Sequence, residues 1–186
     1  WGGVVRGAFG LAETLRPGAA EVLAKMRAQG LQVEVLTGDG ERAGAALARR
    51  LGVPVRSGLL PHQKMEAVAA AESGGPVAMA GDGLNDAPAL ARAGVGFALG
   101  CGADITRQTA DVSLLGDDLS QIGWTLGLAR RTYRTIGWNL AWAFVYNVAG
   151  IALAMGGRLH PVLAAGAMVL SSALVVGNSL RLTSYD

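Results

Sequence analysis

Two carboxylates, Asp82 and Asp86, stand out in the segment AGDGLNDAPALA, which begins at Ala80. Unit charges about 4 Å apart repel by roughly 1 kcal/mol in water and by about 4 kcal/mol at an effective dielectric of 20. A nearby cation would relieve this repulsion. Mg²⁺ suits the pair, because it binds one or two carboxylates together with waters and phosphate oxygens. Alternatively, Asn85 and Asp86 cap the following helix, which leaves Asp82 unexplained.

A second polar segment, TGDGER, begins at Thr37 and follows the apolar run LQVEVL. Thr37 offers a hydroxyl group and backbone N–H groups ahead of a helix, which suits a phosphate oxygen. Gly38 permits a sharp turn and a close approach to a ligand. The alternative for Thr37, Gly38 and Asp39 is an ordinary strand-to-helix turn with a capping side chain.

Lys64 is the third candidate, in the first turn of the helix that LPHQK is expected to begin. The helix dipole disfavours a cation there by up to about 1 kcal/mol. A lysine at this place is therefore consistent with a bound anion. The alternative is a solvated surface lysine.

Short apolar runs alternate with helical patterns in the first part of the chain, which predicts an α/β fold with a parallel, doubly wound sheet. The predicted strands lie near Val4 and in the runs that begin at Leu31, Pro76, Val95 and Asp111. A helix is predicted over residues 17–29, where Val22, Leu23 and Met26 share one face. Because ligands bind beyond the carboxyl ends of parallel strands, the loops at Thr37 and Asp82 are expected on the same rim.

Charge is distributed unevenly, because Arg158 is the only charged side chain from Thr135 to Leu180. Apolar runs at 136–156 and 162–180 each approach the ~20 residues that a helix needs to cross about 30 Å of hydrocarbon. We expect a cytoplasmic α/β domain over residues 1–118, an amphipathic linker helix over 119–134 and an all-α transmembrane hairpin over 135–186. A buried helix pair in a soluble protein is the alternative.

Arginines flank this hairpin at 130, 131, 134 and 181. The positive-inside rule then predicts an integral protein of the plasma (inner) membrane with both termini in the cytoplasm. The net charge of +2 is too small and dispersed to favour nucleic acid as a partner, and the single Cys101 excludes an internal disulfide. The first residue is Trp1 rather than methionine, which suggests a processed or truncated piece.

The motifs LTGD, LLPHQK, AGDGLNDAPALA, GVGFALG and ADITRQTADVSLL, followed by NLAWAFVYN, MVLSS and GNSLRL, resemble the C-terminal part of heavy-metal-transporting P-type ATPases. The resemblance implies the Rossmannoid sheet of the haloacid dehalogenase-like superfamily, as a partial phosphorylation domain. It also implies that Thr37 and Lys64 hold the transferred phosphoryl group and that Gly38 and Asp39 complete their loop. Asp82 would bind Mg²⁺, with Asn85 and Asp86 in support.

In that family an aspartate attacks the γ-phosphate of ATP, and the aspartyl-phosphate is hydrolysed while the membrane helices change access. The family's Asp-Lys-Thr-Gly sequence does not occur among these 186 residues. The chain alone is therefore expected to be inactive. Its expected partners, in cis or in trans, are the nucleotide-binding and actuator domains, the earlier membrane helices and the lipid bilayer.

Met168, Ser171 and Ser172 share one face of the second apolar run, and Tyr146 with Asn147 lies in the middle of the first. A thioether suits Cu⁺ better than Mg²⁺. The YN and MVLSS segments are similar to the copper-transporting branch, whereas zinc-type members would carry a lysine and an aspartate in these spans. The resemblance thus implies Cu⁺ as the transported ion and a copper chaperone as a further partner. Alternatively, these polar groups serve only helix packing.

Two other functions are consistent with the same residues. The chain could be a non-catalytic membrane-anchored module, or a split-pump subunit that complements a separately encoded half. It could also be an anchored phosphatase of the same superfamily, which requires the same absent aspartate.

Overall fold

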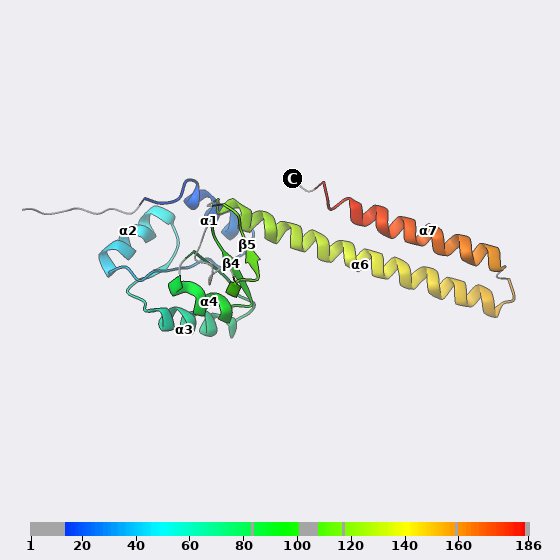
Figure 1. The fold of residues 1–186 in the computed structure, drawn as a ribbon, viewed down its shortest axis with the longest axis horizontal. Coiled ribbons are helices and arrows are strands. Elements are labelled where there is room, and N and C mark those ends of the chain that lie inside the picture. Colours follow the sequence, from blue (N-terminus) through cyan, green and yellow to red (C-terminus); the bar gives the residue numbers. More distant parts are fainter. Residues whose placement is uncertain (1–13, 83, 101–107, 117, 159, 185–186) are drawn as a thin grey trace, which may run out of the picture. The chain divides into compact units, whose positions relative to one another are not determined.

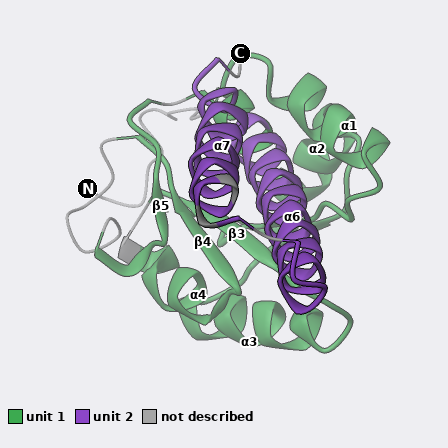
Figure 2. Cartoon of the chain, turned by 90° about the vertical axis from the view of Figure 1, so that its right-hand side faces the viewer, with its two compact units in different colours: residues 1–123 green, residues 124–186 purple. Residues whose placement is uncertain are grey.

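The computed structural model describes residues 14–82, 84–100, 108–116, 118–158 and 160–184 (Figure 1). The predicted strand near Val4 and the single Cys101 lie outside the described residues. Two units divide the chain, residues 1–123 and residues 124–186 (Figure 2). The division lies within the linker helix expected over 119–134, ahead of the change in charge at Thr135.

Parallel strands form two small sheets in the first unit. β1 (Val35–Leu36) pairs with β2 (Val55–Arg56), and β3 (Ala78–Gly81) pairs with β4 (Val95–Ala98), which also pairs with β5 (Val112–Ser113). The parallel pairing confirms the predicted fold class. The described strands form these two sheets instead of the expected single one, because none of them pairs with both β1 and β3.

Helices follow most of these strands. They are α1 (Ala19–Ala28), α2 (Glu41–Leu51), α3 (Pro61–Glu72), the short 3₁₀ helix η1 (Leu84–Asp86) and α4 (Ala87–Arg92). α1 confirms the helix predicted at 17–29, and its Met26 is buried while Val22 and Leu23 are half-buried. Proline begins α3, where its missing N–H costs no hydrogen bond.

The core of the first unit lies between α3, α4 and β4. Phe97 and Leu90 are its largest fully buried side chains, and Val68 and Ala98 are buried with them. A Cβ atom at Gly96 would come within 2.9 Å of the Leu90 carbonyl oxygen. Glycine therefore allows the α4 backbone to approach β4 closely. This packing supports the loop between β3 and α4.

The second unit is a pair of antiparallel helices, α6 (Ser120–Met155), whose first turn belongs to the first unit, and α7 (Pro161–Leu180) (Figure 1). The linker helix and the first apolar run, expected as separate elements, form one helix because proline is absent from 120–155. Among the described residues α6 is long and apolar enough to cross a membrane, and the apolar part of α7, Ala164–Leu180, is shorter.

Polar side chains join the two long helices. The side-chain Nδ2 of Asn178 donates to the side-chain Oδ1 of Asn139 at 2.8 Å. The Nδ2 of Asn139 donates to the Ser179 hydroxyl at 3.1 Å. Asparagine on apolar helices is costly in hydrocarbon unless it finds such partners. These hydrogen bonds therefore fix the register of α6 against α7.

Candidate functional site

Thr37 begins the loop that follows β1. Its backbone N–H donates to the Arg56 carbonyl at 2.9 Å, which extends the pairing with β2 by one residue. Its hydroxyl donates to the Asp39 carboxylate at 2.6 Å and accepts from the Asp39 N–H at 3.2 Å. Gly40, not Asp39, is the N-cap residue of α2, and glycine has no side chain with which to cap the helix. The loop is therefore closed through Thr37 itself.

A neighbouring loop, residues 57–60, holds this turn in place, and no sequence pattern predicts it. The Gly58 N–H donates to the Asp39 carbonyl at 2.7 Å and the Leu59 N–H donates to the Thr37 carbonyl at 3.0 Å. Gly58 has a φ of 69°, a conformation that favours glycine. A Cβ atom at Gly38 would lie 3.4 Å from the Leu59 carbonyl oxygen, so the two loops are in contact.

Lys64 and Asp86 form an ion pair between α3 and the start of α4. The Lys64 Nζ lies 2.7 Å from the Asp86 Oδ1, and the two side chains are only 13% and 15% exposed. Asp86 is the N-cap residue of α4 but makes no side-chain cap hydrogen bond. Its carboxylate therefore serves Lys64 and not the helix end.

Gly81, the last residue of β3, lies against Asp86. An added Cβ atom would come within 2.7 Å of the Asp86 Cβ and 2.8 Å of its Oδ2. Because such contacts are too short, glycine at this position is what allows the Asp86 carboxylate to reach Lys64.

Asp82 follows β3 and pairs with a cation that the sequence did not reveal. The Arg16 Nη2 donates to the Asp82 Oδ2 at 2.5 Å, and the Asp82 side chain remains 56% exposed. Each carboxylate of the predicted pair thus has its own cation in this structure. Asn85 is exposed beside them. Among the described residues, no three His, Cys, Asp or Glu side chains are grouped so as to hold a metal ion.

The Thr37 hydroxyl thus follows the carboxyl end of β1, and the Asp82 carboxylate follows that of β3. The Lys64 ammonium group lies against the loop after β3 through its pairing with Asp86. The structure joins Thr37 to Asp39 and Lys64 to Asp86. The Asp82 carboxylate, directly after β3, is exposed to solvent. Such a set can bind an anion through lysine and loop N–H groups, and a hard cation through carboxylate oxygens.

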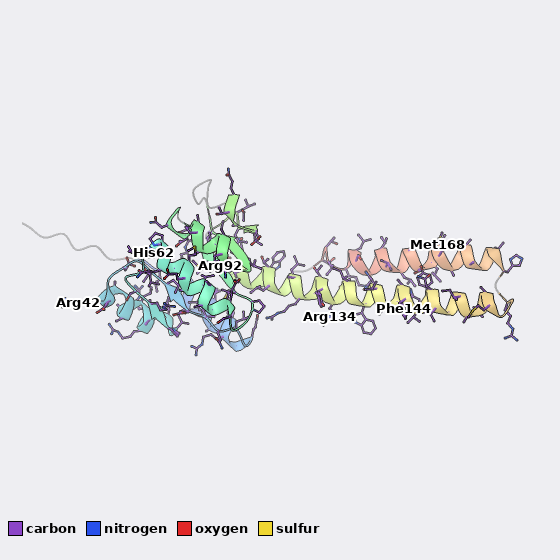
Figure 3. All side chains as sticks on the ribbon, turned by 90° about the horizontal axis from the view of Figure 1, so that it is seen from below. Arg42, His62, Arg92, Arg134, Phe144 and Met168 are labelled. Carbon is purple, nitrogen blue, oxygen red and sulfur yellow. The ribbon has the colours of Figure 1, made fainter. Side chains whose placement is uncertain are left out.

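The five residues expected to bind a transported metal lie on α6 and α7. Ser171 is buried, at 6% exposure, and Tyr146 is half-buried. Asn147 and Ser172 are exposed, and Met168 is 61% exposed on α7 (Figure 3). The helix pair alone therefore covers Ser171 and leaves the Met168 thioether uncovered.

Known proteins match both the sequence and the fold. A family model for haloacid dehalogenase-like hydrolases matches residues 2–94. Cation-transporting P-type ATPase B of Mycobacterium bovis is 45% identical over 185 residues, which are 98% of this chain and 25% of the relative. The probable copper-exporting P-type ATPase V of Mycobacterium tuberculosis is 44% identical over 98% of this chain and 24% of its own length.

A solved structure agrees with these relatives. The crystal structure of a zinc-transporting PIB-type ATPase in its E2.Pi state has a TM-score of 0.87 and 38% sequence identity, over 91% of this chain and 28% of that one. This chain thus spans about a quarter of the length of the curated relatives that it matches. It belongs to the haloacid dehalogenase-like hydrolase family, and its relatives over nearly its whole length are cation-transporting P-type ATPases.

Proposed function

We propose that this chain is the C-terminal part of an ATP-driven heavy-metal pump that exports Cu⁺. The observation that carries the proposal is the arrangement around β1 and β3. The Thr37 loop is fixed by the 57–60 loop, and the buried Lys64–Asp86 pair lies against Gly81 at the end of β3. An anion bound at this rim would meet a lysine, a hydroxyl group and loop N–H groups together.

In this proposal Thr37 and Lys64 bind the transferred phosphoryl group. Lys64 needs little rearrangement, because its ammonium group is already held by Asp86 at 2.7 Å. Gly38 and Asp39 shape the loop, because the Asp39 carboxylate accepts a hydrogen bond from the Thr37 hydroxyl and the Asp39 N–H donates one back to it. The phosphorylated aspartate would come from a part of the pump that this sequence does not contain, so this chain alone would not turn over ATP.

Mg²⁺ fits the residues present at the end of β3. Asp82 offers a 56% exposed carboxylate, and the neighbouring donors of Asn85 and Asp86 are also oxygens. Two carboxylates with waters and a phosphate oxygen form an ordinary magnesium environment. When bound, Mg²⁺ would neutralise phosphate charge. Arg16 would have to share or release Asp82 for this purpose, and Lys64 would keep Asp86 oriented.

Cu⁺ is the proposed cargo, bound by Met168 with Tyr146 and Asn147 and more weakly by Ser171 and Ser172. The uncovered thioether of Met168 supports a site completed by other membrane helices. The described parts of α6 and α7 carry no lysine or aspartate. The 44% identity to the probable copper-exporting P-type ATPase V favours Cu⁺, whereas a matched structure at 38% identity is that of a zinc-transporting ATPase.

The proposed setting is the plasma membrane, with α6 and α7 in the bilayer and the first unit in the cytoplasm. The remaining pump domains would act on this unit in cis or in trans, and a copper chaperone would supply the ion. Arginines at 130, 131 and 134 and at 181 support this orientation.

The proposed role of Asp82 in phosphoryl transfer is tested in the full-length pump in membrane vesicles. Asp82→Asn is expected to abolish Mg²⁺-dependent phosphorylation from ATP, whereas Glu34→Gln, which removes an exposed carboxylate paired with Arg56, leaves it unchanged. Normal phosphorylation of Asp82→Asn would refute the assigned role. Absence of any phosphorylation in the unaltered protein would instead favour a non-catalytic module.

The proposed role of Met168 in binding Cu⁺ is tested by measuring Cu⁺ transport into the same vesicles. Met168→Ala is expected to lower Cu⁺ uptake at least tenfold, because a soft ligand is lost. Met155→Ala is the matched control, since Met155 is 81% exposed at the end of α6 and has no proposed role. Zn²⁺ transport that exceeds Cu⁺ transport in the unaltered pump would overturn the choice of ion.

A further inference from the structure

Two adjoining cavities lie beside the α6–α7 pair. One has a volume of about 540 Å³ and is lined mainly by apolar side chains, among them Trp138, Trp142 and Leu174. The other, of about 360 Å³, is lined by Arg131, Arg134, Thr135 and Leu182. Trp138, Asn178 and Arg181 line both, so the two cavities adjoin at these residues.

The charged cavity has an unusual composition for a surface between apolar helices. Its lining has three guanidinium groups, a hydroxyl group and an amide, and it has no carboxylate. The described residues of 124–184 contain no Asp or Glu. Guanidinium groups bind phosphate through paired N–H donors, which makes phosphate the matching anion.

The apolar cavity continues from the charged one along the helices. Trp138 is 69% exposed and Trp142 is 46% exposed, one helical turn apart. Tryptophan is enriched where membrane hydrocarbon meets the head groups. The hydrogen bonds among Asn139, Asn178 and Ser179 hold α6 and α7 together beside this cavity, so its two walls are fixed before a ligand enters.

We propose that these cavities bind one anionic phospholipid, with its phosphate between Arg134 and Arg181 and an acyl chain along Trp138 and Trp142 (Arg134 is labelled in Figure 3). Basic pockets between membrane helices on the cytoplasmic side suit such head groups. A free inorganic anion would use the arginines but leave the apolar cavity unexplained. The proposal requires that the helices lie in a bilayer, and it does not depend on which ion is transported.

Native mass spectrometry tests the proposal on the whole protein that contains this chain. The detergent-solubilised protein is mixed with equal amounts of phosphatidylglycerol and phosphatidylcholine of the same chain length, and preferential retention of phosphatidylglycerol is expected. In Arg134→Gln/Arg181→Gln that retention should fall about tenfold for each lost guanidinium. Equal retention of the two lipids by the unaltered protein would overturn the proposal.

Arg158→Gln is the control, because it makes the same kind of substitution in the turn between α6 and α7, away from the cavities, and removes one positive charge where the paired variant removes two. It is expected to retain phosphatidylglycerol as the unaltered protein does, and a loss as large as that of the paired variant would overturn the site. Displacement of phosphatidylglycerol by millimolar inorganic phosphate would also overturn it, in favour of a free anion.

A second measurement needs no variant and therefore does not depend on whether the paired variant folds. Brominated phosphatidylglycerol in nanodiscs is expected to quench the tryptophan fluorescence of the unaltered protein more strongly than brominated phosphatidylcholine does. Equal quenching by the two lipids would contradict the proposal.

Discussion

The Lys64–Asp86 ion pair has a measurable energetic consequence, because both side chains are largely buried. Lys64→Met leaves the Asp86 carboxylate without its cation and should destabilise the α3–α4 region by about 3 kcal/mol. Amide hydrogen exchange in α3 and α4, read by mass spectrometry, measures this change locally. Lys64→Met/Asp86→Leu should recover much of the loss, and a double variant less stable than the single one would contradict this account.

Gly81 gives a second prediction at this scale. Gly81→Ala places a Cβ atom 2.7 Å from the Asp86 Cβ, so the loop after β3 must shift. We expect a loss of about 1–3 kcal/mol, the usual cost of overpacking, in hydrogen exchange of β3 and α4. Gly123→Ala is the control, because its added Cβ meets nothing within 4 Å and lies in a helix, where alanine is favoured. Equal losses in both variants would refute the steric argument.

Sequence reasoning could find the residues that follow strands but not all of their partners. Asp82 and Thr37 were recognisable because each directly follows an apolar run. Arg16 was not, because it lies 66 residues from Asp82 and no local pattern marks such a pairing. The 57–60 loop contributes through backbone N–H groups, which every residue type except proline possesses.

At the level of elements, the start of α6 is sensitive to acid. The Ser120 hydroxyl and then the Ser120 backbone N–H donate to Asp118, and these hydrogen bonds lower the pKa of that carboxyl below its usual value. A lowered pKa means that the stabilisation is present above the usual aspartate range and is lost as pH falls through the lowered value. Amide protection at Ser120–Ile122 should therefore decrease in acid.

Asp118→Asn provides the comparison for this acid dependence. It removes the titrating group, so the protection of the first turn should become independent of pH over the same range. If the variant keeps the acid dependence of the unaltered protein, Asp118 is not its source.

Element prediction succeeded where the periodicity was long and failed where it was short. α1 and the two apolar helices were evident from repeating apolar positions. β2 was missed, because Val55 and Arg56 follow Pro54 and do not belong to an apolar run like those that contain β1 and β5. The linker helix and the first span were separated on hydropathy alone, although no proline lies between them to break the backbone hydrogen bonds of a helix.

At the scale of the whole molecule, the arginine distribution predicts which side of the membrane each segment occupies. In a Cys101→Ser background, Arg158→Cys should react with a membrane-impermeant maleimide added outside intact cells. Cys101, the single cysteine of these 186 residues, should react only after the cells are permeabilised. Labelling of Cys101 in intact cells would reverse the proposed orientation.

That the chain has an α/β part and a helical part was predictable from its strand and helix patterns, but the change in charge and hydropathy comes at Thr135, after the division between the units at residues 123 and 124. The number of sheets was not, since pairing between strands depends on neighbours distant in sequence. The same limit applies to the cavities beside α6 and α7. They depend on Asn139 meeting Asn178, which lies 39 residues away.

The continuity of α6 has a mechanical consequence. A helix of 36 residues is about 54 Å long at 1.5 Å per residue, and its hydrogen bonds make it stiff in torsion. A rotation of the helix near Ser120 therefore also rotates Tyr146 and Asn147 about the helix axis. A single inserted residue would rotate everything beyond it by roughly 100°, so the phase of this helix is as constrained as its composition.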